Sequence, residues 1–170
     1  MAQYPSEIYT PREKENRNGV EYVPEKKSVH FAEDNIKLDD EVVAIETDLE
    51  ARKYSITLII DGGGAAITTG QKGHLEIPFA CEIEQVTLLA DVEGSIVIDI
   101  WKDTYANFPP AVGDTITAAA KPTLAAEQKY QDATLTDWIK AIAAGDVLAF
   151  NVDSAATVTR VTLALKVKKT

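Results

Sequence analysis

The segment from 101 to 110 gathers the residue types that carbohydrate-binding sites use. Its aromatic, amide and carboxylate side chains are Trp101, Asp103, Tyr105, Asn107 and Phe108. Aromatic faces can stack against sugar rings, and the polar atoms of Asp and Asn can hydrogen-bond to sugar hydroxyls. These five residues therefore form a candidate glycan-contact surface.

The three aromatic side chains of this segment have a second interpretation. They can fill one end of the folded domain or pack against a neighbouring subunit. Large aromatic side chains contribute most to stability when they are buried, and we favour the second interpretation on that ground. Unchanged glycan or host-cell binding by a folded Trp101→Ala or Tyr105→Ala variant would exclude the first.

Other patterns that suggest catalysis or ligand binding are incomplete. The glycine-rich stretches 61–64 and 70–73 lack the Gly-Lys-Ser/Thr ending and the following helix of a phosphate loop, so we expect a hairpin. The histidines, His30 and His74, have no Cys, Asp or Glu at metal-ligand spacing. Any acidic chain offers carboxylate pairs such as those among Asp99, Asp103 and Asp114. We therefore expect no enzymatic activity, no metal and no cofactor.

The overall charge argues against a nucleic-acid partner. The net charge is −10, whereas nucleic-acid binding relies mainly on Lys and Arg side chains that neutralise phosphates. No apolar run reaches the roughly 18 residues of a membrane span, and the N-terminus lacks the pattern of a secretion signal. The single cysteine, Cys81, is expected to be a small buried hydrophobe, which fits synthesis in a reducing cytoplasm.

Acidic residues are concentrated in the N-terminal part of the chain. Residues 1–50 hold 13 acidic and 6 basic side chains, whereas residues 51–170 hold 14 and 11. The first part is polar and contains several prolines, so it cannot bury enough surface to fold alone. Its irregularly spaced apolar residues predict an extended arm that lies on the surface of another protein. The expected anchoring residues are Tyr4, Ile8, Tyr9, Tyr22 and Phe31.

A short helix is predicted from Glu33 to Glu50. Asp34 or Asn35 can cap its first turn, and apolar residues follow at spacings of four, three and four. These form a heptad seam of Leu38, Val42, Ile45 and Leu49. With only about two heptads, the helix either packs on its own domain or associates with other copies, and both alternatives remain open.

After residue 53 the apolar periodicity changes to two, which predicts antiparallel strands. The alternating segments are 54–60, 75–79, 86–92, 96–101, 147–152 and 161–167. Turns are expected at 61–64 and at Glu93-Gly94, while Thr134–Ala143 fits either a helix or a strand. The expected fold is all-β: an antiparallel, jelly-roll-like β-sandwich over residues 51–170, preceded by the arm and one short helix.

Both parts of the sequence resemble proteins of tailed-phage particles. The N-terminal part resembles the start of fibre and structural proteins in Tyr4–Asn16, Gly19–Val20, Phe31–Asp34 and Asp39–Glu46. The C-terminal part resembles a module of fibre and head-decoration proteins in Ile60–Gly64, Ile67–Gly70, Pro78–Phe79, Leu88–Asp91, Gly94–Asp103 and Thr162–Val167. The resemblance covers most of the chain. It implies a trimeric, non-enzymatic display domain whose N-terminus docks on the virion, and it brings no catalytic residues.

The expected function is that of a structural protein in a phage particle. The chain would be a homotrimeric head-fibre or decoration protein, or a short tail appendage, bound to other virion proteins through residues 1–50. The alternative is a carbohydrate- or host-receptor-binding module of a tail fibre that uses the 101–110 segment. Glycan binding by the isolated sandwich would favour that alternative.

Overall fold

The computed structural model describes residues 37–47 and 52–170. The chain divides into two units, Met1–Asp48 and Leu49–Thr170. Several expected functional residues lie outside the described residues, namely Tyr4, Ile8, Tyr9, Tyr22, Phe31 and Leu49. Their roles in anchoring and self-association stay predictions.

Residues 37–47 form a helix, within the range that the apolar spacing predicts. The seam residues Leu38, Val42 and Ile45 are all exposed, as is the neighbouring Val43. No helix within the described ranges is long and apolar enough to cross a membrane.

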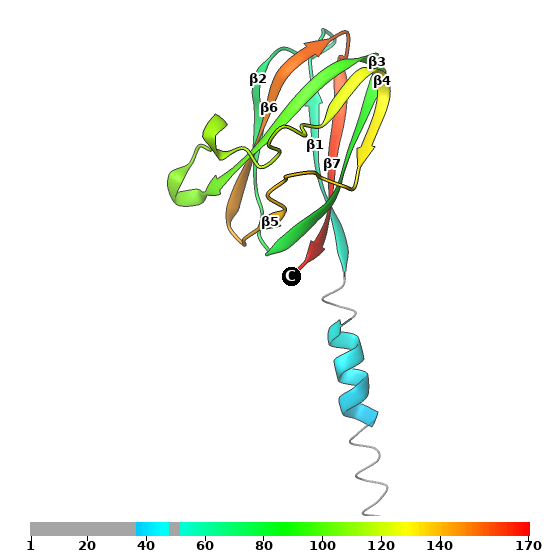
Figure 1. Ribbon diagram of the computed structural model, residues 1–170, viewed down its shortest axis with the longest axis vertical. Coiled ribbons are helices and arrows are strands. Elements are labelled where there is room, and N and C mark those ends of the chain that lie inside the picture. The colour runs from blue at the N-terminus through cyan, green and yellow to red at the C-terminus, as the bar shows by residue number, and fades with distance from the viewer. Residues whose placement is uncertain (1–36, 48–51) are drawn as a thin grey trace, which may run out of the picture. The chain divides into compact units, whose positions relative to one another are not determined.

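The second unit is built from antiparallel strands, so the expected all-β, sandwich-like fold with one preceding helix is confirmed (Figure 1). The strands are β1 (Lys53–Asp61), β2 (Gly70–Glu76), β3 (Cys81–Thr104), β4 (Thr123–Asp132), β5 (Ala141–Ile142), β6 (Asp146–Ala156) and β7 (Arg160–Lys169). Two short 3-10 turns, η2 (Tyr105–Asn107) and η3 (Val112–Asp114), follow β3. The order of the strands in the sheet is β1-β7-β3-β6-β2, with β4 and β5 also paired to β3.

Strand β3 runs through both layers of the sandwich. Its first part, 81–90, pairs with β7, and its second part, 95–104, pairs with β6. Strand β1 extends the first layer beyond β7, and β2 extends the second layer beyond β6. The sheet therefore bends once across its strands, and in Figure 1 the green ribbon of β3 turns between its two parts.

The two layers share one core. Alternate residues point inward in most of the strands, most clearly in β7, as the period of two predicts. Those at the centre of the core, all inaccessible to solvent, are Val86, Leu88, Ile96, Ile98, Ile100, Leu148, Phe150, Leu163 and Leu165. Cys81 is also buried, as the sequence predicts. Among the described residues, the members of this core lie between Ile56 and Val167.

The expected turn at Glu93-Gly94 is wrong, because both residues lie inside the continuous strand β3. Gly94 sits at the bend, where the chain connecting β6 to β7 passes very close. A Cβ atom at this position would lie 2.7 Å from the carbonyl oxygen of Ala156 and 2.7 Å from Val158 Cγ2. The glycine therefore permits the close approach of two chain segments at the bend.

Residues 133–140 form neither a helix nor a strand, and only Ala141–Ile142 pair with β3. Leu135, Trp138 and Ile142 are nevertheless buried, so the apolar spacing reflects an irregular segment packed on the core. Trp138 Nε1 donates a 2.9 Å hydrogen bond to the carbonyl oxygen of Ala120. This bond satisfies the polar atom of a largely buried indole.

Candidate functional site

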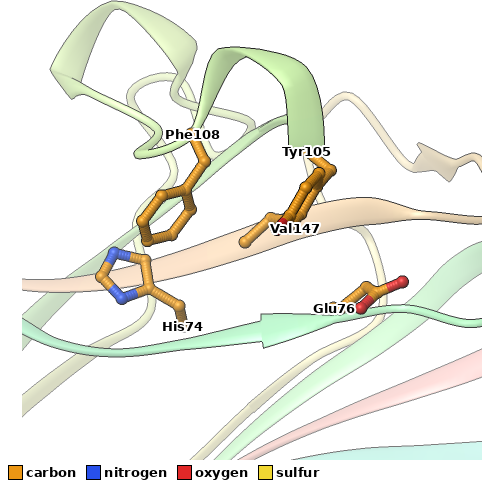
Figure 2. A pocket seen from close by; sticks show the side chains of 5 residues that line it. All are labelled: His74, Glu76, Tyr105, Phe108 and Val147. Carbon is orange, nitrogen blue, oxygen red and sulfur yellow. The ribbon is translucent and has the colours of Figure 1, made fainter.

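A cavity of about 440 Å³ lies on the outer face of the second layer. It is lined by His74 and Glu76 of β2, Val147 of β6, and Tyr105 and Phe108 from the segment after β3 (Figure 2). The strand register sets this arrangement, because Ala149 pairs with both His74 and Trp101. Val147 likewise pairs with both Glu76 and Asp103. Residues of β2 and β3 that are far apart in the sequence thereby lie on either side of β6, at the same level of the sheet.

The segment after β3 is held by hydrogen bonds to the end of β3 and to β2. Asp103 Oδ1 accepts from the backbone N–H of Thr104 at 2.7 Å and from Asn107 Nδ2 at 3.0 Å. These bonds, that from Asn107 above all, lower the pKa of Asp103 below its ordinary value. Gln71 Nε2 of β2 donates to the Pro110 carbonyl oxygen at 3.0 Å and ties the end of the segment to the sheet edge.

Two aromatic rings form one wall of the cavity. The rings of Phe108 and His74 meet edge to face, with centroids 4.9 Å apart and an interplanar angle of 66°. Tyr105 lies on the other side, above Val147, and Glu76 lies near it (Figure 2). Tyr105 is 75% exposed and Phe108 is 50% exposed. The cavity is therefore open to solvent and bordered by rings that a ligand can reach.

The five predicted glycan-contact residues separate into two groups. Tyr105 and Phe108 line the cavity, as the glycan interpretation requires. Trp101 is buried, as the alternative interpretation requires, and its indole Nε1 has no hydrogen-bond partner among the described residues. Asp103 and Asn107 bond to each other and hold the segment in place. Glycan contact by this set as a whole stays a prediction.

Sequence reasoning missed His74 and Glu76 as members of this site. Both alternate with the inward-facing Leu75, so their orientation away from the core could have been predicted. Their neighbourhood could not, because it depends on β6 lying between β2 and β3. No local signal specifies that order of strands.

A second polar cluster surrounds the buried carboxylate of Asp99 on the same outer face. Its oxygen Oδ1 accepts 2.6 Å hydrogen bonds from the hydroxyls of Thr115 and Thr117. Lys121 Nζ lies 3.0 Å from Asp99 Oδ2 and 2.6 Å from Asp153 Oδ2. Burial raises the pKa of Asp99, but the hydrogen bonds outweigh it, so the pKa is lower than usual. The cluster satisfies its own charges and attaches 115–121 to the sheet.

Within residues 37–47 and 52–170, no group of three or more His, Cys, Asp or Glu side chains is arranged to hold a metal ion. The absence of a metal, of a cofactor and of enzymatic activity stays an expectation from the sequence.

Comparison with known proteins gives little support for any family. No protein family and no curated protein matches the chain. One solved structure, described as "Structure of infectious bursal disease virus Gx strain", is similar at 15% sequence identity with a TM-score of 0.21. The match covers 71% of this chain and 35% of that chain, so this chain spans about a third of the neighbour's length. A TM-score this low gives the likeness no weight for either fold or function.

Proposed function

We propose that this chain is a non-enzymatic structural protein of a tailed-phage particle. Residues 1–50 dock on other virion proteins and help to associate three copies, and the sandwich projects from the particle as a head-fibre, decoration or short tail-appendage domain. The sequence resemblance described above suggests this role. The chemistry of the described residues is compatible with it, because Asp99, the most buried carboxylate, is satisfied within the fold.

The observation that carries the proposal is the exposed apolar seam of the 37–47 helix. Leu38, Val42 and Ile45 recur at heptad spacing and are each at least half exposed. None of the three is among the described residues of the sandwich core. An amphipathic helix gains most of its stability from packing its apolar face, and a heptad seam is the face that coiled coils bury. Other copies of the same helix are the occupant that this spacing favours.

The seam is short and acidic, which limits what it can contribute alone. Asp39, Asp40, Glu41 and Glu46 flank it and would repel one another in a tight bundle. The sandwich therefore supplies part of the contact between subunits in this proposal.

Substitution on and beside the seam tests self-association. Val42 and Val43 are adjacent valines in the same helix, 50% and 59% exposed, and only Val42 lies on the seam. Val42→Asp should raise the dissociation constant of the assembly by about tenfold or more, because it places a charge in the buried seam. Val43→Asp costs the same helix propensity and should leave the dissociation constant nearly unchanged. Light scattering across a dilution series measures both.

Either of two outcomes would overturn the self-association part of the proposal. One is a wild-type mass equal to the 18.5 kDa of one chain at every concentration, and the other is an equal effect of the two substitutions. A particle reconstruction tests the rest. It should show three copies of this chain around one axis with their N-terminal segments against the virion, and a location away from any particle would refute it.

A further inference from the structure

The polar side chains that line the cavity leave their hydrogen-bonding atoms unpaired within the described residues. Within the described part of the chain, His74, Glu76 and Tyr105 make no side-chain hydrogen bond or ion pair, although all three border one cavity. Polar groups just outside the cavity differ, because Asp103 bonds to Asn107 and Gln71 bonds to Pro110. The groups outside hold the wall together, and the groups inside are available to a ligand.

The mixture of these groups constrains the chemistry of the ligand. An anionic ligand would face the Glu76 carboxylate, on a sandwich whose residues 51–170 hold 14 acidic and 11 basic side chains. A cationic ligand would be attracted to Glu76 and to the aromatic faces, but it would offer no acceptor to the His74 and Tyr105 donors. Hydroxyl groups both donate and accept, so a neutral polyhydroxylated ring can use all three polar side chains.

We propose that this cavity binds a neutral sugar residue of a larger glycan. The faces of Tyr105 and Phe108 pack against the ring, and His74 and Glu76 hydrogen-bond to its hydroxyls. A volume of about 440 Å³ is near the small end of ligand pockets, about 300–1,000 Å³, and accommodates one or two rings. Because the cavity is open, the rest of the glycan can extend into solvent.

This activity is independent of attachment to a particle, since every residue that lines the cavity belongs to the sandwich. It also differs from the contact set that the sequence suggests. Trp101 is buried and Asp103 is bonded to Asn107, and none of these three residues lines the cavity, whereas His74 and Glu76 of β2 do.

The test is binding of the full chain to a glycan array. The array carries neutral oligosaccharides of glucose, galactose, mannose and N-acetylglucosamine together with neutral bacterial surface polysaccharides. Heparin fragments and a trimethyllysine peptide serve as anionic and cationic probes. We expect binding to at least one neutral glycan and weaker binding to both charged probes. Isothermal titration with the best neutral oligosaccharide then gives the dissociation constant.

Substitutions assign the binding to the cavity. Tyr105→Ala removes an exposed stacking face and Glu76→Gln removes the charge while it keeps the shape, and each should weaken binding by about tenfold. Glu127→Gln is the matched control, because Glu127 is also an exposed glutamate on a strand. It pairs with Gly94 of β3, whereas the cavity lies near the other end of β3, beside Tyr105. Circular dichroism confirms that each variant is folded.

The proposal is overturned by a folded chain that binds none of the neutral glycans. Tighter binding to either charged probe also overturns it, as does undiminished binding by folded Tyr105→Ala and Glu76→Gln. None of these three outcomes affects the particle proposal, which depends on the mass of the assembly and on the location of the chain.

Discussion

At the scale of single residues, Asp99 attaches an irregular segment to the sheet. Its side chain is 1% exposed, and its bonds to Thr115, Thr117 and Lys121 cross from β3 to the 115–121 segment. A buried carboxylate is costly unless hydrogen bonds and an opposite charge compensate it. The apolar alternation of β3 predicts a solvated position for Asp99. That prediction is wrong, because a neighbouring segment covers the face.

Asp99→Asn should destabilise the protein by about 1–3 kcal/mol at pH 7, since it removes the charge that Lys121 and two hydroxyls surround. The pKa of Asp99 lies below its ordinary value of 3.8 in the folded chain. The stabilisation is therefore fully present above about pH 4 and is lost as the pH falls through the lower folded value. Urea unfolding of both proteins at pH 7 and at pH 3 should show the difference shrinking at pH 3.

Asp153→Asn is the matched control for this prediction. It removes the more exposed carboxylate of the same lysine and should cost less than about 1 kcal/mol at pH 7. Equal losses from the two substitutions would contradict the role assigned to burial of Asp99.

At the scale of elements, the bend in β3 decides the architecture. Because 81–90 pairs with β7 and 95–104 pairs with β6, one strand belongs to both layers. Gly94 lies where this bend meets the connection between β6 and β7. A Cβ atom at position 94 would lie only 2.7 Å from atoms of that connection.

Gly94→Ala should therefore destabilise the sandwich by about 1–3 kcal/mol, because the added methyl group meets backbone that cannot move freely. Gly113→Ala is the control. A Cβ at Gly113 meets nothing within 4 Å, so its effect should stay within about 0.5 kcal/mol. Chemical denaturation measures both, and a Gly94 variant as stable as the control would show that the bend can relax.

The success of sequence prediction also varies from element to element. Strands β1 and β7 show clear alternation and lie where the pattern predicts them. Strand β4 carries only one fully buried residue, Leu124, so its sequence gives no alternating signal. Tyr105 and Phe108 could be selected as site residues from their types alone. His74 and Glu76 could not, because their proximity follows from long-range pairing through β6.

At the scale of the whole molecule, the core formed by the described residues lies between Ile56 and Val167, inside the sandwich. A chain that begins at Ala51 should therefore keep the thermal midpoint of the full chain by circular dichroism, yet lose binding to virus particles that lack this protein. Removal of residues 1–36 alone is the informative comparison, because it keeps the helix and separates anchoring from self-association. Undiminished particle binding by the chain that begins at Ala51 would refute the anchoring role of residues 1–50.

The two ends of the sandwich lie beside each other. The backbone N–H of Lys169 donates a 3.3 Å hydrogen bond to the carbonyl oxygen of Arg52, and β1 and β7 are paired along their whole length. Proteins whose ends are adjacent tolerate insertion into loops of other chains and rearrangement of their chain order. The sandwich therefore has the adjacent ends that insertion into a loop of another protein would use.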